Sequence, residues 1–91
     1  MCAYEKEIRV VREKINKLDR SIFKIIKQRT KLAKKVSKIK RKYGKPIFDK
    51  KREDEILKFV RSLAVKHGLE PKSIERIFKE IIRLCKEIEK T

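Results

Sequence analysis

Apolar residues recur through the first half of the chain at alternating spacings of three and four positions. They form one row, called here the a/d row: Ile8, Val11, Ile15, Leu18, Ile22, Ile25, Leu32, Val36, Ile39 and Tyr43, with Arg29 in the remaining slot. Such spacing, sustained over about five heptads, indicates one long helix that packs against other helices. This helix should run from about Glu5 to Lys42 and end at the break Gly44-Lys45-Pro46.

Two shorter helical patterns follow that break. Asp49 is suited to cap a second helix, and Gly68 is suited to close it. The apolar face of this helix consists of Ile56, Val60, Leu63 and Ala64. Pro71 fits the first turn of a third helix. The apolar stripe of the third helix consists of Ile74, Ile77, Phe78, Ile81, Ile82, Cys85 and Ile88. No segment predicts a strand, so we expect an all-α fold in a single domain spanning residues 1–91.

The length of the first helix predicts the oligomeric state. At about 1.5 Å per residue it would extend for about 55 Å, roughly twice the length of either later helix. A lone chain of 91 residues with so elongated a helix buries little surface. The a/d row therefore predicts an intertwined homodimer in which two long helices pack side by side.

The composition limits the kinds of molecule that we expect the protein to bind. The formal net charge of +16 attracts anions: nucleic acid, acidic surfaces or small polyanionic metabolites. Cys2 and Cys85 form no CxxC pair, and His67 has no second His or Cys nearby, so we expect no metal site. The N-terminus has no apolar signal region and no long apolar segment occurs, so we expect a cytoplasmic protein that does not enter a membrane.

Arg29 is the residue that most clearly departs from the apolar pattern. Its guanidinium keeps its proton, so burial without a partner is very unfavourable. Either a carboxylate pairs with Arg29, or the position receives an anion from outside. Lys40 lies eleven residues later, about three helical turns, and therefore points the same way, with its backbone about 16 Å distant.

Other polar residues join apolar faces further along the chain. Asp49, Arg52 and Glu53 share a face in the first turn of the second helix. By itself Arg52 could form an ordinary surface ion pair with Asp49 or Glu53, worth under about 1 kcal/mol. Glu89 ends the stripe of the third helix, although a position so near the C-terminus could also belong to a fraying end.

Four stretches taken together resemble the all-helical chorismate mutases: VREKINKLD, IIKQRTKLAKKVSKIK, GKPIFDKKRE and GLEPKSIERIFKEII. The resemblance extends from about Ile8 to Glu89 without insertions. It implies an intertwined dimer of three-helix chains with two equivalent active sites. It also implies that chorismate is converted to prephenate by a [3,3]-sigmatropic rearrangement, without metal or cofactor, in phenylalanine and tyrosine biosynthesis.

The resemblance also implies roles for single residues. Arg12 of one protomer and Arg29 of the other resemble the arginines that bind the two substrate carboxylates. Lys40 resembles the lysine that contacts a carboxylate and the breaking ether oxygen. Arg12 and Arg29 are 17 residues apart, about 25 Å along one helix, which is too far to grip one small dianion. An antiparallel pair of long helices would bring Arg12 to the site from the second chain.

The remaining implied roles belong to the second and third helices. Glu53 resembles the acceptor of the substrate ring hydroxyl, and Asp49 and Arg52 match residues that line and order the pocket. Cys85 would make a packing or weak hydrogen-bonding contact and is not expected to be a nucleophile, because no base is placed to activate it.

Glu89 departs from the pattern of the bacterial-type members, which commonly carry Gln at this position. It would be the second donor to the ether oxygen, beside Lys40. A carboxylic acid donates only when it is protonated. Turnover should therefore decline as the pH rises and Glu89 loses its proton, and Glu89→Gln should remove the decline.

Three alternatives remain open at this point. Isochorismate pyruvate lyase shares the fold and similar cationic residues, although the complete GKPIFDKKRE block favours the mutase. A nucleic-acid-binding protein would suit the charge, but the aromatic residues mostly fall on packing faces and no helix-turn-helix or zinc signature is present. A purely structural coiled coil gives no reason for Arg29, Lys40 and Glu53 to occur together.

Overall fold

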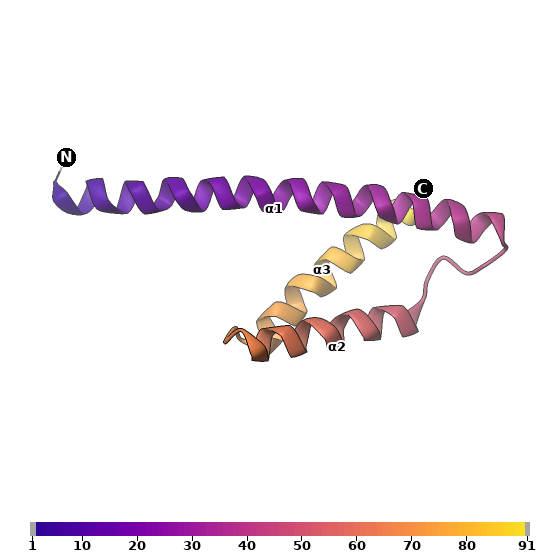
Figure 1. The fold of residues 1–91 in the computed structure, drawn as a ribbon. Coiled ribbons are helices and arrows are strands. Elements are labelled where there is room, and N and C mark those ends of the chain that lie inside the picture. The colour runs from indigo at the N-terminus through magenta and orange to yellow at the C-terminus, as the bar shows by residue number, and fades with distance from the viewer. Residues whose placement is uncertain (1, 91) are drawn as a thin grey trace.

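The computed structural model describes residues 2–90 and consists of three helices joined by two short connections (Figure 1). The helices are α1 at Ala3–Lys42, α2 at Lys50–Lys66 and α3 at Pro71–Glu89. No strand occurs among the described residues. The predicted all-α class with one long and two shorter helices is confirmed. The first helix begins two residues before the expected Glu5 and ends at Lys42 as expected.

Glycine ends both α1 and α2 by the same mechanism. Gly44 and Gly68 have φ angles of 64° and 72°, in the left-handed region that a side chain would disfavour. The residue after each glycine donates back to the helix: Lys45 N to Lys40 O at 2.8 Å, and Leu69 N to Ala64 O at 2.9 Å. Each of these bonds joins residues five positions apart, as in a Schellman motif. Such bonds satisfy carbonyl groups at the end of the helix, where the chain changes direction.

Acidic side chains cap the two later helices. Asp49 accepts a hydrogen bond from Arg52 N at 3.1 Å through its Oδ1 atom, so the predicted cap of α2 is confirmed. Glu70 caps α3 by accepting from Lys72 N at 3.1 Å and Ser73 N at 2.6 Å. Pro71 fills the first turn of α3, as expected, where a missing N–H leaves no bond unmade.

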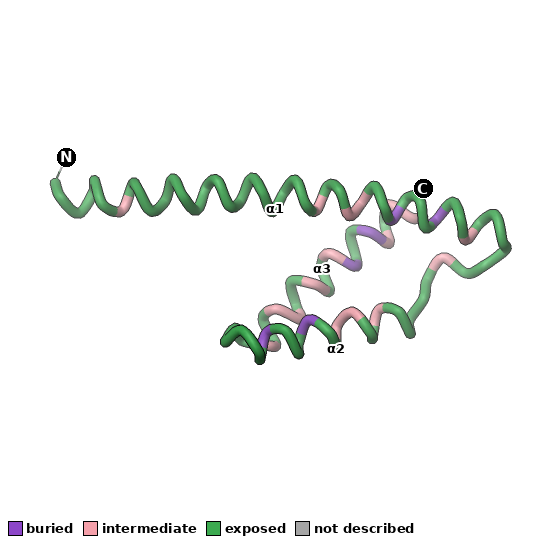
Figure 2. The backbone as a smooth tube through the Cα atoms, viewed as in Figure 1, coloured by how far each residue is buried: buried purple, intermediate pink, exposed green. Residues whose placement is uncertain are grey.

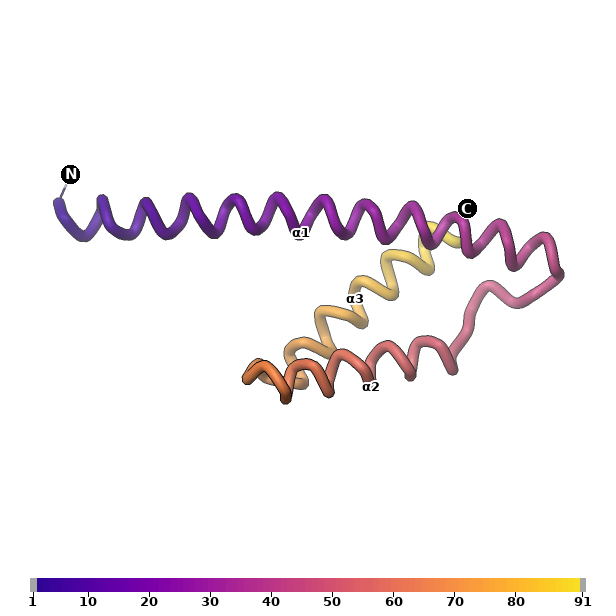
Figure 3. Tube along the Cα trace, in the orientation of Figure 1, coloured from indigo at the N-terminus to yellow at the C-terminus, as the bar shows by residue number. Residues whose placement is uncertain are grey.

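Helix α3 connects the other two helices in space. It packs against α2 and then crosses the C-terminal half of α1, while the backbones of α1 and α2 do not approach each other closely within residues 2–90 (Figures 1 and 3). The buried side chains follow this path, and they are Ala33, Ser37, Val60, Ala64, Ile82 and Cys85. The N-terminal half of α1 extends beyond the crossing and is exposed along almost its whole length (Figure 2).

The single chain is therefore elongated and leaves its a/d row uncovered. Its Cα radius of gyration is 17.7 Å, and its longest extent is 62 Å. A compact chain of this length would have a radius of about 12 Å. From Val11 to Tyr43 the apolar members of the a/d row are between 42% and 64% exposed. None of the helices within the described part of the chain combines the length and apolarity needed to span a membrane.

Candidate active site

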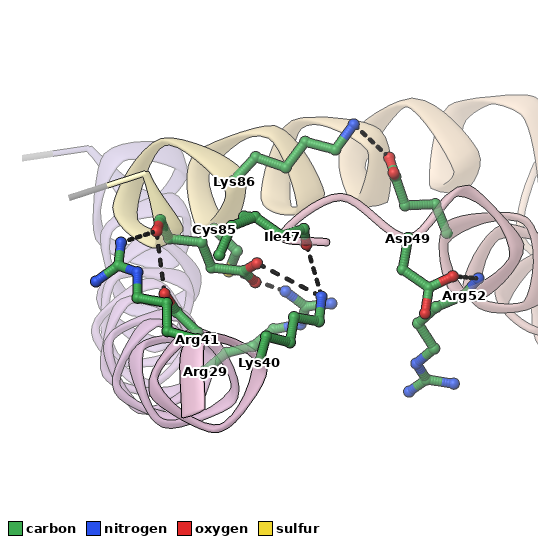
Figure 4. A network of polar contacts seen from close by, with 11 residues as sticks. Arg29, Lys40, Arg41, Ile47, Asp49, Arg52, Cys85 and Lys86 are labelled. Atoms are coloured by element: carbon green, nitrogen blue, oxygen red, sulfur yellow. Dashed lines mark hydrogen bonds and ion pairs between the residues drawn. The ribbon is translucent and has the colours of Figure 1, made fainter. Parts of the chain in front are cut away.

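A pocket lies where the C-terminal half of α1, the connection to α2, the start of α2 and the end of α3 meet (Figure 4). Its open space is about 400 Å³. Seven of the eight predicted site residues line it, and these are Arg29, Lys40, Asp49, Arg52, Glu53, Cys85 and Glu89. The structure thus gathers at one place residues that are up to 60 positions apart in the sequence.

Arg29 reaches the pocket from α1 and contacts α3. Its Nη1 donates to Cys85 Sγ at 2.9 Å, and Cys85 is buried. No carboxylate of residues 2–90 forms an ion pair with Arg29. A cysteine sulfur is a weak acceptor. The partly buried guanidinium is therefore held in place without being neutralised by a carboxylate of the described residues.

Lys40 and Glu89 meet at one end of the pocket. Lys40 Nζ donates to Ile47 O at 2.6 Å and lies 3.8 Å from Glu89 Oε2. The two side chains are only 20% and 14% exposed, so both are screened from most of the solvent. The Ile47 carbonyl belongs to the connection between α1 and α2, and the hydrogen bond to it fixes the direction of the Lys40 ammonium (Figure 4).

The first turn of α2 supplies three of the predicted residues with different roles. Asp49 is engaged by its cap, and Glu53 pairs with Lys86 of α3 at 2.7 Å. Arg52 is 66% exposed and forms an ion pair at 3.7 Å with Glu55, one turn later. A pair of Arg52 with Asp49 or Glu53, the alternative considered from the sequence, does not form between the side chains.

Lys86 is a pocket residue that the sequence analysis missed. Besides its ion pair with Glu53, its ammonium lies 5.2 Å from the centre of the Phe48 ring. Lys86 follows Ile82 by four positions and precedes Glu89 by three, which places all three on one helical face. That spacing was the signal in the sequence for a place in the pocket. It did not distinguish Lys86 from the many other lysines, most of which are expected to be solvated.

Arg12 is the one predicted site residue that the single chain does not bring to the pocket. It is exposed on the N-terminal half of α1, 17 residues before Arg29. That separation is about 25 Å along the helix axis, much longer than an arginine side chain.

Cationic side chains outnumber the acidic ones around the pocket by four to three. The four cations are Arg29, Lys40, Arg52 and Lys86. Of the three carboxylates, Asp49 is occupied by its cap and Glu53 by Lys86. Residues 2–90 contain no group of three His, Cys, Asp or Glu side chains arranged to hold a metal ion. The site is thus suited to bind and orient a small organic anion by hydrogen bonds and charge.

A family model described as chorismate mutase type II matches residues 11–90. The chain belongs to this family. The match includes all eight predicted site residues and confirms the resemblance drawn from the four sequence stretches. It also confirms the expected class of enzyme, a chorismate mutase, and gives no support to the lyase or nucleic-acid alternatives.

Three relatives of this mutase chain show how the domain occurs elsewhere. A chorismate mutase of Methanocaldococcus jannaschii is 36% identical over 80 residues, which cover 88% of this chain and 81% of that protein. A bifunctional chorismate mutase/prephenate dehydratase of Aquifex aeolicus is 34% identical over 88 residues, covering 93% of this chain but 24% of that protein. The T-protein of Enterobacter agglomerans is 29% identical over 77 residues, covering 85% and 21%.

Proposed function

We propose that this chorismate mutase family member converts chorismate to prephenate at the pocket between α1, α2 and α3, in a homodimer whose second chain supplies Arg12. The observation that carries the proposal is the arrangement of three side chains. Arg29 offers a guanidinium that no carboxylate within the described part of the chain pairs with, and Lys40 and Glu89 lie together at one end of the same pocket. These are the groups that a flexible dianion with an ether oxygen requires.

The reaction itself needs little from the protein. In the [3,3]-sigmatropic rearrangement the ether C–O bond breaks as a new C–C bond forms within the same molecule, so no nucleophile or proton carrier is required. The enzyme has to hold the enolpyruvyl side chain over the ring in a near-reactive shape. It also has to stabilise the negative charge that develops on the ether oxygen as the C–O bond lengthens.

Arg29 serves the first requirement. A guanidinium can bind a carboxylate through two parallel hydrogen bonds, which fixes orientation as well as distance. The hydrogen bond from Arg29 to Cys85 Sγ holds the guanidinium group in the pocket before substrate binds. Arg12 of the second chain would bind the other carboxylate, so that the two arginines hold the substrate from opposite sides of a shared site.

Lys40 and Glu89 serve the second requirement. The Lys40 ammonium has three donors, and its hydrogen bond to Ile47 O leaves others for the substrate. Glu89 would donate to the same ether oxygen in its protonated form. Both groups are in place before the reaction and little exposed, so stabilising the developing charge requires little reorganisation.

The α2 residues would bind the ring. Glu53 uses Oε1 for Lys86 and keeps its other oxygen available to accept a bond from the ring hydroxyl. Lys86 thereby sets the direction of the Glu53 carboxylate. Asp49 holds the first turn of α2 through its cap, and Arg52, beside it at the mouth of the pocket, would add positive charge near the substrate.

The exposed surface of the single chain supports the homodimer. The chain has an accessible area of 7910 Å². A compact monomer of this mass would expose about 5,600 Å², so the excess is roughly 2,300 Å² per chain. Interfaces of permanent homodimers reach this size and are apolar. A second copy laid along the a/d row would cover the exposed apolar residues and, if antiparallel, would bring its Arg12 towards Arg29.

A chorismate-disappearance assay with identification of the product tests the proposed reaction. We expect prephenate. Unchanged chorismate would overturn the proposal. So would a protein that forms no prephenate from chorismate but converts isochorismate to salicylate and pyruvate. Light scattering of the same sample should give the mass of two chains, and a monomer with full activity would overturn the shared site.

A further inference from the structure

The last carbonyl of α3 is held by two side chains of α1 that the mechanism above does not use. Ser37 Oγ donates to Glu89 O at 3.1 Å, and Arg41 Nη2 donates to the same oxygen at 2.9 Å (Figure 4). Ser37 is 4% exposed, at the point where α1 and α3 cross. A carbonyl oxygen has two lone pairs, so these two bonds fill its accepting capacity.

A fixed carbonyl at this position matters because helix ends are loose. The last carbonyls of a helix have no partner within the helix, and the final turn frays unless something else binds them. Ser37 and Arg41 are four residues apart and so lie on one face of α1, where both can reach the same atom. The Arg41 cation also stands at the negative end of the α3 dipole.

The residue whose carbonyl is held is also the residue whose carboxyl group enters the pocket. Glu89 is thus fixed at two points: its carbonyl by Ser37 and Arg41, and its side chain beside Lys40. Neither Ser37 nor Arg41 lines the pocket. They border a separate groove together with Lys34, Lys38 and Ile88. Their side-chain hydrogen bonds therefore reach the pocket through Glu89.

We infer that Ser37 and Arg41 are positioning residues that keep the final turn of α3 ordered, so that the Glu89 carboxyl stays aimed at the ether oxygen of the substrate. The inference rests on the proposed function for its effect on turnover, but the ordering of the final turn does not depend on any substrate. Glu89 is the last residue of α3, where a helix tends to fray, and these two hydrogen bonds counteract the fraying.

The kinetic test uses Ser37→Ala and Arg41→Ala. Each should lower kcat by about threefold to tenfold, the effect of losing one hydrogen bond. KM should stay within about twofold, because Glu89 acts on charge that develops only in the transition state. Ser37→Thr retains the hydroxyl and should keep most of the activity. Ser62→Ala, in α2, removes a hydroxyl bonded only to Lys58 O of its own helix and should leave kcat unchanged.

A double-mutant cycle separates positioning from general stability. In a Glu89→Ala background, the same two substitutions should change kcat by less than about twofold, because the group they position has gone. Losses that multiply fully in that background would overturn the inference, as would single variants with parental kcat. Lys38→Ala is the control for Arg41→Ala, since the Lys38 side chain has no hydrogen bond or ion pair to any residue among 2–90.

Amide hydrogen exchange makes the two proposals separable. Protection of the last turn of α3 should fall in Arg41→Ala and stay parental in Lys38→Ala. A parent protein that leaves chorismate unchanged overturns the proposed function, whereas unchanged protection in Arg41→Ala overturns the positioning role even if the parent is active. Arg41 is on the surface, so its replacement tests the inference even if Ser37→Ala fails to fold.

Discussion

Lys40 Nζ and Glu89 Oε2 lie 3.8 Å apart although their residues are 49 positions apart in the chain. The contact exists because the end of α3 crosses α1 one helical turn before Lys40, at Ser37. Two groups able to stabilise charge on one oxygen atom are thus brought together by helix packing, before any substrate is bound. The proposed chemistry depends more on this pair than on any other contact in the pocket.

Replacement of Lys40 should therefore lower turnover strongly. Lys40→Ala removes a cation aimed at the developing negative charge and should reduce kcat by about a hundredfold to a thousandfold, the effect of removing such a donor. Steady-state kinetics with chorismate measures it. Lys38→Ala, on the same helix and exposed, is the matched control and should keep parental kcat. A Lys40→Ala enzyme within tenfold of the parent would contradict the role given to Lys40.

The pH dependence of turnover tests Glu89. The carboxyl can donate to the ether oxygen only in its neutral form, so kcat should decline as the pH rises and Glu89 loses its proton. In Glu89→Gln the amide is a donor at every pH, and the decline should disappear. Profiles of kcat against pH for the two proteins make the comparison. A flat profile in the parent would rule out protonated Glu89 as a donor.

The helix ends could be predicted because each depends on a local signal. Gly44 and Gly68 adopt the left-handed conformation that ends a helix, and Asp49 accepts the bond of an ordinary N-cap. The cap by Glu70 escaped prediction because Glu is not among the preferred capping residues, and because its bonds depend on Ser73 three positions later.

The pocket-lining residues on α1 and α3 could be predicted where they interrupt or end an apolar row, as Arg29 and Glu89 do. The contacts between them could not, because they depend on how the helices cross. The ion pair of Arg52 illustrates the limit. Sequence spacing offers partners on either side, and Arg52 pairs with Glu55 where Asp49 serves as the cap and Glu53 pairs with Lys86. The pairing of Lys86 with Glu53 likewise requires α2 and α3 to be side by side.

Acid should weaken the cap of α3. The pKa of Glu70 is lowered below its ordinary value, chiefly by the hydrogen bond from the Ser73 hydroxyl and also by the backbone N–H groups of Ser73 and Lys72. A carboxyl whose pKa is lower in the folded chain stabilises the fold at pH values above its ordinary, unfolded value. That contribution is lost as the pH falls through the lowered value.

Glu70→Gln should consequently lower the melting temperature at neutral pH and reduce its fall between neutral pH and about pH 3, because the neutral side chain has no proton to gain. Thermal unfolding followed by circular dichroism at several pH values measures both effects. Glu80→Gln, an exposed carboxylate paired with Arg83, is the matched control. Equal acid sensitivity in Glu70→Gln and the parent would contradict the assignment.

A charge within the a/d row should separate the chains. Ile22 is 54% exposed in the single chain and would be covered by the second copy. Ile22→Glu would place an unpaired carboxylate in that apolar interface, which is strongly unfavourable. We expect a lower mass by light scattering and a parallel loss of activity at low protein concentration. Lys24→Glu changes the charge at a position between Ile22 and Ile25 that is not part of the row, and should leave the dimer intact. An Ile22→Glu protein that stays dimeric would place the interface elsewhere.

Mixing two inactive variants tests whether Arg12 acts across the dimer. Arg12→Ala and Arg29→Ala should each be inactive, because each removes one of the two carboxylate-binding arginines from both sites. In an equal mixture that exchanges chains, half of the dimers are mixed, and each mixed dimer has one site with both arginines intact. Activity should therefore return to about one quarter of the parental value per chain. Recovery needs chain exchange, so it should appear only after the mixture is diluted or mildly denatured and restored. An exchanged mixture that remains inactive would show that Arg12 and Arg29 serve a site within one chain, whereas an Arg12→Ala protein with parental activity would show that Arg12 has no part in binding.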